Sequence, residues 1–431
     1  MKRLLALVLA LVMLLCTACG EKEPEVPQET ITELTFWTYP YGNFDDPETV
    51  KMLLMQFQSV YPNVRVNAEY LTEENADEAI SAAIEGGETP DIVFTTPNHP
   101  VAEWSGMGCM ADLSSLWNDS DYDEVLDACE SACFTSDGAC YLYPIAMNVS
   151  CMAINYDAFV QAGADKYIDL EKRTWSDEDF IKAVRALYDT FHEPVAAVYC
   201  GGQNGDYGTR ALVCSLFGGS FTNEMHTGYA VDSEEMIRAL KLLQDMKGII
   251  FDDAIVGQDE ALLFYLENLK LSFYWDAQQQ MDPAGQGNGV GKTKNGQRIE
   301  YMYYPSATGA QSLPGEIWGM CVFNNGDEAR LTAAKQFVKY FADGEGTASA
   351  VRAAGCYPVR NIAEGNDLTS LWNNNTVMNE YSMMVKSLGE DDSITPNWPV
   401  ARSEWYKLLQ RLGQNEAVTA DEVAKFMEAV K

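Results

Sequence analysis

The chain has 431 residues and a formal net charge of −35, with 64 Asp and Glu against 29 Lys and Arg. This charge would repel nucleic-acid phosphates and anionic lipid headgroups, so it excludes both as binding partners and favours a neutral or cationic ligand. A chain of about 400 residues exceeds what one hydrophobic core usually organises, so the length predicts two domains.

The N-terminal residues have the pattern of a secretory signal peptide. A basic start precedes an apolar run from Leu4 to Leu15, which is too short to span a bilayer. The sequence TACG at residues 17–20 then resembles a bacterial lipobox, although Cys16 stands where that motif usually has Leu. We expect residues 1–18 to be removed and Cys19 to be lipidated, with residues 19–32 forming a flexible tether; the alternative is a Cys19 thiol that carries no lipid.

Eleven cysteines are many for an exported chain. Nine remain once Cys16 leaves with the signal peptide and Cys19 carries lipid, so at least one thiol has to stay outside any intramolecular disulfide. Cys129, Cys133 and Cys140 lie close together in an acidic stretch, which leaves a bridge among them open. Their C-x3-C-x6-C spacing has no fourth ligand nearby and is a poor zinc signature, so we expect no metal site.

The folded part opens with alternating strand and helix patterns. These are a strand at Leu34–Thr38, a helix with apolar residues spaced from Val50 to Val60, an alternating strand at Val64–Tyr70, a helix at Ala76–Glu85 and a strand at Ile92–Thr95. The order βαβαβ predicts a parallel sheet with helices on both faces. Ligands of such sheets bind at the carboxyl ends of the strands.

The next elements indicate a second lobe. The run Tyr141–Phe159 is long and extended, as expected of a chain that crosses from one lobe to the other. Beyond it, helices are predicted from their caps and apolar spacing: one begins at Ser176, one begins at Asp232-Ser233 and ends at Gly248, and later ones cover Leu331–Phe341, Pro399–Leu412 and the segment after Thr419. The predicted fold class is therefore α/β, each lobe being a mostly parallel sheet flanked by helices.

Several strings together resemble the solute-binding proteins of carbohydrate ABC importers, the maltose-binding-protein-like group. They are TFWTYPYGN at 35–43, AAIEGGETPDIVFTTP at 82–97, YLYPIAMNVSCMAINYDAFVQAGA at 141–164, RTWSDEDFIKAVRAL at 173–187, LSFYWDAQQQ at 271–280, LPGEIWGMCVFNNGDEARLTAAKQFVKYF at 313–341 and CYPVR at 356–360. The resemblance implies a two-lobed, type II binding-protein fold with lobe boundaries at 33–147 plus 317–362 and at 148–316 plus 363–431. The chain would cross the hinge near Met147, near Glu316 and after Arg360.

The resemblance also implies the function. We expect a lipid-anchored monomer on the outer face of the bacterial cell membrane that closes around a sugar or oligosaccharide and delivers it to the permease of an ABC importer. It would be no enzyme and would need no cofactor. Carried across by motif, the ligand-binding residues are Tyr39, Asn43, Thr95, Thr96, Asn148, Trp275, Asp276, Glu316, Trp318, Tyr357, Arg360 and Trp398.

The chemistry of these residue types suits a sugar, which offers an apolar C–H face and a rim of hydroxyls. Trp275 followed by Asp276 could pair a stacking surface with a strong acceptor, although a lone Trp packs more often in the core. Trp37, Tyr39 and Tyr41 alternate at the end of the first strand, which favours Tyr39 for the cleft. The glycine-rich loop at 201–208 brings Gln203 and Asp206 as further candidates, or it merely forms a turn. Arg360 could grip a hydroxyl or form a salt bridge, and Trp318 could pack in the hinge.

Two motifs point elsewhere and are rejected. The glycine-rich run at 287–296 lacks the first glycine of a phosphate-binding loop, because Gln286 stands there. The three histidines are far apart in the sequence and form no HExxH motif. The alternatives that remain are a binder of polyamines or peptides on the same scaffold and, less favoured, a secreted glycoside hydrolase with two cleft carboxylates.

Overall fold

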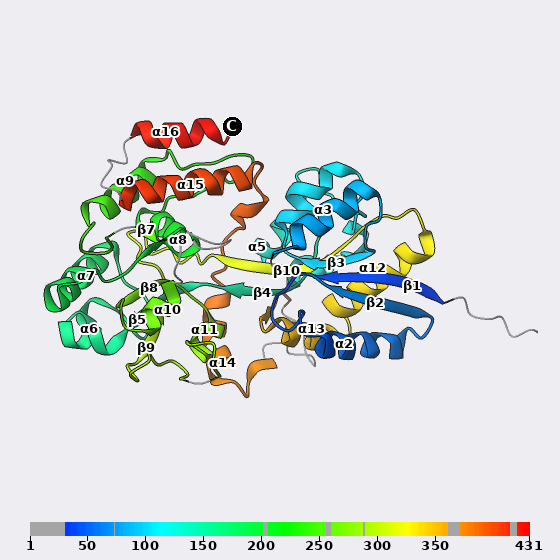
Figure 1. Ribbon diagram of the computed structural model, residues 1–431, viewed down its shortest axis with the longest axis horizontal. Helices are drawn as coiled ribbons and strands as arrows, with labels where there is room; N and C mark the ends of the chain where they lie inside the picture. The colour runs from blue at the N-terminus through cyan, green and yellow to red at the C-terminus, as the bar shows by residue number, and fades with distance from the viewer. Residues whose placement is uncertain are drawn as a thin grey trace, which may run out of the picture.

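The computed structural model describes residues 31–72, 74–200, 206–252, 254–255, 260–287, 289–360, 371–413 and 420–431. The chain forms two lobes, each built on sheets covered by helices, and strands pass between the lobes (Figure 1). The predicted α/β class and two-lobed fold are confirmed. In the described part of the chain, no helix is both long and apolar enough to cross a membrane.

The first lobe is organised by a six-stranded sheet. Its strands, in the order β11-β4-β10-β3-β1-β2, are β1 (Thr32–Thr38), β2 (Val64–Tyr70), β3 (Ile92–Thr95), β4 (Tyr143–Val149), β10 (Gly315–Val322) and β11 (Tyr357–Pro358). β1 runs parallel to β2 and β3, as predicted. β10 runs antiparallel to β3 and β4, and β11 antiparallel to β4, so "mostly parallel" was wrong for this half of the sheet.

The first two helices are confirmed: α3 has the predicted ends, and α2 contains the predicted apolar spacing from Val50 to Val60. α2 (Pro47–Val60) begins at Asp46, whose carboxylate accepts hydrogen bonds from the backbone N–H groups of the first turn. α3 (Ala76–Gly86) ends at Gly87, which adopts a left-handed conformation with φ of 68°. The predicted βαβαβ unit is therefore confirmed, and it delivers the segments after β1 and β3 to one edge of the sheet.

Helices and short turns cover the first sheet. They are η1 (Asn98–Trp104), η2 (Ser105–Met107), η3 (Ser114–Leu116), α4 (Asp119–Glu124), α5 (Asp127–Ser131), α12 (Glu328–Ala342) and α13 (Thr347–Ala354). Phe337 of α12 contacts Phe36 of β1 and Phe57 of α2, with ring centroids 5.2 and 4.9 Å apart. A helix from late in the sequence thus completes the core that the first residues begin.

The second lobe holds two small sheets. β5 (Cys151–Asn155) pairs antiparallel with β8 (Leu271–Trp275) and β9 (Ile299–Met302), while β6 (Val198–Tyr199) and β7 (Ala254–Ile255) run parallel. The prediction of a mostly parallel sheet was wrong for the three-stranded sheet of this lobe. Its helices are α6 (Tyr156–Ala162), η4 (Asp165–Tyr167), α7 (Asp177–Phe191), α8 (Tyr207–Phe217), α9 (Glu234–Asp245), α10 (Glu260–Tyr265), α11 (Ala277–Met281), α14 (Thr376–Val385), η6 (Asp392–Ile394), α15 (Trp398–Gly413) and α16 (Ala420–Ala429).

Most of the predicted helix starts are confirmed in this lobe. Ser176 and Ser233 cap α7 and α9 with their hydroxyl oxygens. The extended run at 141–159 is shorter than predicted, because Asn155 caps α6 and turns the chain into a helix. α15 begins one residue before the predicted Pro399, and Thr419 lies outside the described residues.

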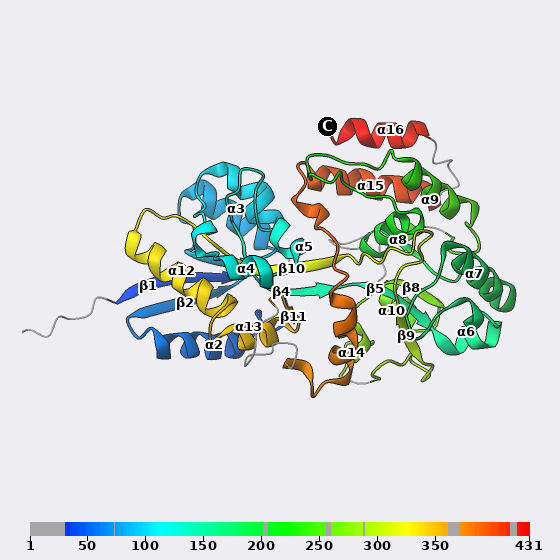
Figure 2. The same ribbon diagram turned by 180° about the vertical axis from the view of Figure 1, so that it is seen from behind.

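The crossings between lobes involve β4 and β10. The predicted crossing points Met147 and Glu316 lie within these two strands, which pair with each other in the first sheet. A further segment, from the end of α14 to the start of α15, runs along the junction between the lobes (Figure 2). The predicted crossing after Arg360 falls outside the described residues, and the lobe boundaries stay a prediction.

The nine cysteines from Cys109 to Cys356 are thiols. Cys129 Sγ lies 3.6 Å from Met147 Sδ, and Cys140 Sγ accepts a hydrogen bond of 3.2 Å from Trp117 Nε1. The cluster of Cys129, Cys133 and Cys140 therefore contains no disulfide. Its thiols fill the core as small apolar groups.

Candidate functional site

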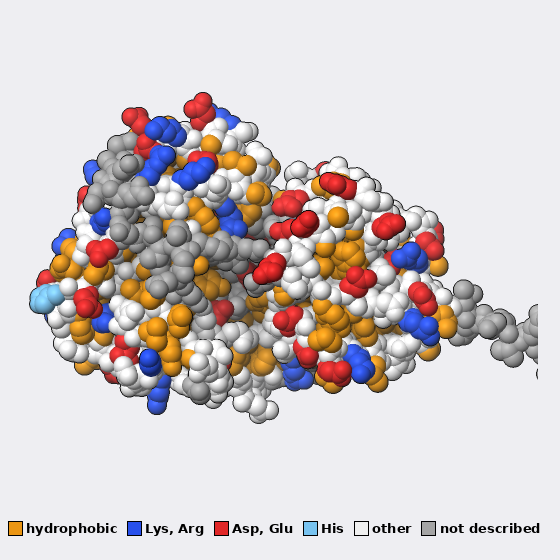
Figure 3. Space-filling model, viewed as in Figure 1, with side chains coloured by type: hydrophobic (Ala, Val, Ile, Leu, Met, Phe, Trp, Pro, Cys, Tyr) orange, Lys and Arg blue, Asp and Glu red, His pale blue; other side chains and the backbone are white. Residues whose placement is uncertain are grey.

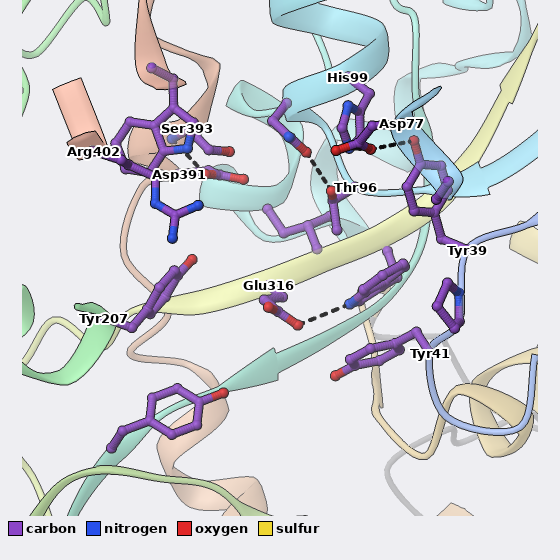
Figure 4. Close-up of a pocket in the computed structure, with 17 residues that line it drawn as sticks. Tyr39, Tyr41, Asp77, Thr96, His99, Tyr207, Glu316, Asp391, Ser393 and Arg402 are labelled. Atoms are coloured by element: carbon purple, nitrogen blue, oxygen red, sulfur yellow. Dashed lines mark hydrogen bonds and ion pairs between the residues drawn. The ribbon is translucent and has the colours of Figure 1, made fainter. Parts of the chain in front are cut away.

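A cavity of about 350 Å³ lies between the two lobes, with β10 as its floor (Figure 4). The first lobe supplies Tyr39, Pro40, Tyr41, Ala76, Asp77, Thr96, Asn98 and His99. The second lobe and the segment before α15 supply Tyr207, Tyr274, Asp391, Ser393, Trp398 and Arg402, and β10 supplies Glu316, Ile317 and Trp318. η6 lies against η1 of the first lobe, so residues of both lobes line the same cavity.

The wall after β1 is built around Tyr39. Its backbone N–H still bonds to Phe94 O at 3.1 Å, which fixes the residue at the end of the strand. Its hydroxyl donates to Asp77 Oδ1 at 3.0 Å, and its ring stacks on His99 with centroids 5.1 Å apart. Burial, followed by the nearby Asp77 charge, raises the pKa of Tyr39 well above its usual range. Tyr39 therefore remains a neutral hydrogen-bonding group at the cavity edge.

Tyr41 lines the cavity with its ring stacked face to face on the buried Trp318. Their ring centroids lie 4.0 Å apart with an interplanar angle of 17°. The Trp318 Nε1–H donates to Glu316 Oε2 at 3.2 Å, which orients both side chains of β10. The pairing of β10 with β4 shifts register between Trp318 and Gly319, and a Cβ on Gly319 would come within 2.4 Å of Tyr143 O. Glycine thus permits the irregularity that presents Trp318 to the cavity.

The opposite wall carries Asp391 and Arg402. Asp391 accepts a hydrogen bond from Ser393 N at 2.8 Å, and burial raises the pKa of its carboxyl group. Arg402 Nη2 donates to Tyr406 Oη at 2.6 Å and lies 3.7 Å from Asp206 Oδ1. Charged groups therefore reach this cavity from the second-lobe side as well as from Asp77 and Glu316. Figure 3 shows acidic side chains gathered along the junction on the side of the first lobe.

Five of the predicted site residues line the cavity: Tyr39, Thr96, Glu316, Trp318 and Trp398. Thr95 lies next to them but is fully buried, and its hydroxyl has no hydrogen-bond partner. Asn43 is exposed in the loop after β1, where its backbone N–H donates to Ala353 O at 2.7 Å. Whether any of these residues contacts a ligand stays a prediction.

Trp275 and Asp276 lie elsewhere. Trp275 is fully buried in the second lobe, donates to Gln280 Oε1 at 2.8 Å and packs on Phe264. Asp276 caps α11 by accepting from Gln279 N at 2.8 Å. The polar run after Trp275 marks this helix start and not a strand edge exposed to the cleft. Asn148 Nδ2 donates to Asp276 Oδ2 at 3.2 Å, so two predicted ligand residues bind each other across the hinge.

Three more predicted positions make structural contacts away from the cavity. Asp206 is buried and lies 3.0 Å from Arg210 Nε. Tyr357 donates its hydroxyl to Met378 O at 2.8 Å. Arg360 pairs with Asp121 at 3.3 Å and donates to Pro144 O at 3.0 Å. Gln203 and Cys19 fall outside the described residues.

The cavity also contains residues that the sequence did not single out: Tyr41, Asp77, His99, Tyr207, Tyr274, Asp391 and Arg402. Tyr274 could have been found, because it precedes Trp275 in β8 and successive strand residues face opposite sides. Asp391 and Arg402 had no local signal, since they reach the cavity only through the fold. In the part of the chain that the structure describes, no group of His, Cys, Asp or Glu could hold a metal ion.

Comparison with known proteins gives a consistent result. The family model of bacterial extracellular solute-binding proteins matches residues 53–376. A cyclic alpha-maltosyl-1,6-maltose binding protein from Arthrobacter globiformis superposes with a TM-score of 0.73 at 18% identity, over 93% of this chain and 98% of the other. No curated protein sequence matches significantly.

Two further solved structures share the fold. The GacH receptor of Streptomyces glaucescens gives a TM-score of 0.67 at 16% identity, over 93% of this chain and 100% of the receptor. UgpB from Mycobacterium tuberculosis, solved with glycerophosphocholine, gives 0.71 at 15% identity, over 92% and 97%. Similarity at this level of identity establishes the shared fold.

Proposed function

Because this chain belongs to the bacterial extracellular solute-binding protein family, we propose that it captures a sugar or oligosaccharide and delivers it to an ABC importer. Membership of this family means that the protein works outside the cytoplasm. Structures with the same fold include proteins solved with acarbose, with maltose and with cycloalternan, which supports a carbohydrate as the solute. Capture is by closure of the two lobes around the ligand.

The observation that carries this proposal is the convergence of flat aromatic rings and strong hydrogen-bond acceptors in one cavity. The ring of Tyr41, supported from behind by Trp318, offers a surface for the C–H face of a sugar ring. The carboxylates of Glu316 and Asp391 accept hydrogen bonds from hydroxyl groups, from the floor and the opposite wall. Because these groups come from different segments, lobe closure can bring them to one ligand together.

Calorimetric titration of the purified protein, lacking its signal peptide, tests the proposal. We expect saturable binding of at least one saccharide from a panel of mono- and oligosaccharides, and a melting temperature that rises with its concentration. The same titration with spermidine and with short peptides addresses the other solutes this scaffold could take. Binding of spermidine or a peptide with no response to any saccharide would contradict sugar capture.

We further propose that the protein only binds its solute and does not convert it. Incubation of the protein with each glycan, followed by chromatography of the products, is expected to return the glycan unchanged. Release of a shorter sugar would instead identify a glycoside hydrolase, and variants of Glu316 and Asp391 would then locate the two carboxylates.

The third part of the proposal concerns the membrane. Cys19 follows an apolar run and lies in a lipobox-like sequence, which supports a lipid anchor and a tether that leaves a monomer free to reach its permease. Mass spectrometry of the protein from membranes is expected to show a diacylated N-terminus at Cys19. Cys19→Ala is expected to abolish the lipid mass, and an unmodified Cys19 in the native protein would contradict the anchor.

A further inference from the structure

The charged groups that line the cavity do not balance. Three carboxylates, Asp77 of α3, Glu316 of β10 and Asp391 before η6, share the space with one guanidinium, that of Arg402. His99 also lines the cavity, but it is charged only when protonated, and it lies 3.7 Å from Asp77 and 3.4 Å from Glu103. The lining therefore carries an excess of negative charge, contributed by three separate elements.

The charge of Arg402 is already shared with an ion-pair network behind the wall. Arg402 lies 3.7 Å from Asp206, Asp206 lies 3.0 Å from Arg210, and Arg210 lies 2.5 Å from Asp392. This network contains two arginines and two aspartates, so it is neutral as a unit. Arg402 therefore leaves the charge of the cavity carboxylates largely uncompensated.

The tyrosines around the cavity respond to this negative field. After burial, the charges of Asp391 and Glu316 are among the causes that raise the pKa of Tyr207, against an opposite effect of Arg210. Glu316 also raises the pKa of Tyr41 and of Tyr274, in each case after burial. Three tyrosines from different segments thus lie within the field of Glu316, and Tyr207 lies within the field of Asp391 as well.

A neutral ligand would leave this imbalance in place when the lobes close. Closure removes water from Glu316 and Asp391, and hydroxyl groups supply hydrogen bonds but no charge. A protonated amine supplies both, and it is attracted by the face of an aromatic ring such as that of Tyr41, which lines the cavity. The aromatic planes that stack on a sugar ring also favour a cationic substituent on it.

We propose that the solute is a saccharide bearing a protonated amino group, such as an amino-sugar oligosaccharide, with the amine between Asp391 and Glu316. The proposal rests on the sugar-binding function given above and specifies its substrate class. It requires the protein to discriminate by charge between ligands of the same carbon skeleton.

Three β-1,4-linked disaccharides form a matched set for the test: the glucosamine disaccharide, its N,N′-diacetylated form and cellobiose. They differ at position 2 of each ring in carrying an ammonium, an acetamide or a hydroxyl group. We expect calorimetry at pH 6 to give the ammonium form a dissociation constant at least tenfold below those of the other two. Added salt is expected to reduce this preference.

Variants locate the effect. Asp391→Asn is expected to abolish most of the preference for the ammonium form, measured as the ratio of its dissociation constant to that of cellobiose with the same variant, and Glu316→Gln to act in the same direction. Asp189→Asn, on the exposed side of α7, is the matched control and is expected to change nothing. Circular dichroism checks that each variant folds; if one does not, the other carries the test.

The outcomes separate this inference from the proposed function. Equal affinity for the ammonium form and cellobiose would overturn the charge preference and leave sugar capture standing. Binding of spermidine without binding of any disaccharide would overturn sugar capture. A preference that survives in both variants would contradict the assignment of the amine to Asp391 and Glu316.

Discussion

At the scale of single residues, Tyr41 shows most directly how this cavity is built. Its ring stacks on Trp318, and its hydroxyl lies 3.3 Å from the Sγ of Cys356, the residue before β11. The residue is half-buried, with one part of the ring held in place by the first lobe and the rest available to the cavity. Ligand binding loses little side-chain entropy at this ring, because Trp318 and Cys356 already hold it in place.

Replacing Tyr41 tests this surface. We expect Tyr41→Leu to weaken saccharide binding by about tenfold, since an aromatic contact contributes roughly 0.5–1.5 kcal/mol beyond its buried area. Tyr61→Leu is the control, because Tyr61 is also half-buried and stacked on an aromatic ring, Phe57 at 4.8 Å, but lies outside the cavity. Titration calorimetry of both variants gives the comparison, and equal losses would argue against a stacking role for Tyr41.

Asp391 links binding to pH. Burial raises its pKa, so the charged form is disfavoured in the folded protein. The groups around it are Asp392, which raises the pKa further, and Arg210, which lowers it. A carboxyl group with a raised pKa stabilises the fold only where it is protonated, and that stability is lost as pH rises through the folded-state pKa.

The raised pKa of Asp391 leads to two predictions. In the free protein, we expect Asp391→Asn to increase the free energy of unfolding at pH 7, because the substitution removes a buried charge. With an ammonium ligand, we expect wild-type affinity to fall on acidification at a higher pH than an ordinary Asp, with its pKa of about 3.9, would give. The variant is expected to lack that acid limb. Denaturant unfolding and titrations between pH 4 and 7 check both.

For individual residues, the sequence was informative near predicted strand ends and where the family resemblance supplied a position. Tyr39 and Thr96 follow predicted strands and line the cavity, as do Glu316, Trp318 and Trp398, which came from the resemblance. Trp275 was selected for its residue type. Side chains alternate between the two faces of a strand, so the alternation that buries Trp275 turns the preceding Tyr274 toward the cavity. Asp391 could not be predicted, because its place depends on a segment packed between two distant parts of the chain.

At the scale of elements, the connection from β1 to α2 positions Tyr39 and Tyr41. It turns at Gly42, whose φ of 56° is left-handed, and a Cβ there would lie 2.5 Å from Ala354 O. The next residue, Asn43, donates its backbone N–H to Ala353 O. The loop is therefore fixed against the C-terminal end of α13. This contact determines where Tyr39 and Tyr41 lie in the cavity.

Gly42→Ala is expected to destabilise the protein by about 2–4 kcal/mol, from left-handed strain of about 1–2 kcal/mol and overpacking of similar size. Gly87→Ala has the same left-handed strain at φ of 68° but nothing within 4 Å of its Cβ, so its cost should stay near 1 kcal/mol. Urea unfolding gives the free energy of unfolding of both variants. The difference between their losses is the cost of the steric clash between the Cβ added at position 42 and α13, beyond the backbone strain that both variants share. Similar losses would mean that the contact with α13 is unimportant.

Elements with local signals were predicted well, and those fixed by distant pairing were not. Ser176 and Ser233 mark helix starts through side-chain caps that need only nearby residues. The direction of β10 and the antiparallel pairing of β5 with β8 and β9 depend on how the chain returns between the lobes. The spacing of hydrophobic residues does not indicate in which direction a returning strand pairs.

At the scale of the whole molecule, Asn148 connects the two lobes. It lies in β4 of the first sheet and donates to the carboxylate of Asp276, which caps α11 in the second lobe. Both groups are buried. Breaking the bond removes the donor of Asp276 Oδ2, while Oδ1 keeps its hydrogen bond from Gln279 N.

We expect Asn148→Ala to lower the free energy of unfolding by about 1–3 kcal/mol and to change the radius of gyration of the free protein. Asn155→Ala is the control, because Asn155 bonds within the second lobe by capping α6. It is expected to destabilise the fold without changing the distance between the lobes. Small-angle X-ray scattering with and without ligand provides the readout, and an unchanged radius in Asn148→Ala would contradict a hinge role.

The two-lobed organisation itself was readable from length and from the order of strands and helices. The wall formed by the segment between α14 and α15 was not, because that segment lies far along the chain from the strands it joins. The position of such a segment is determined by packing against residues that are distant in the sequence. It leaves no periodic pattern in the sequence from which the position could be predicted.

The thiols of the nine cysteines from Cys109 to Cys356 can report how often the folded protein opens. Cys109 and Cys214 are partly exposed and the other seven are buried, so alkylation under native conditions has to wait until the structure opens. Cys356, beneath Tyr41, becomes reachable only when the aromatic wall gives way. A bound solute that holds this wall shut slows the alkylation of Cys356 by the factor by which it suppresses opening, so occupancy can be followed in each molecule by mass alone.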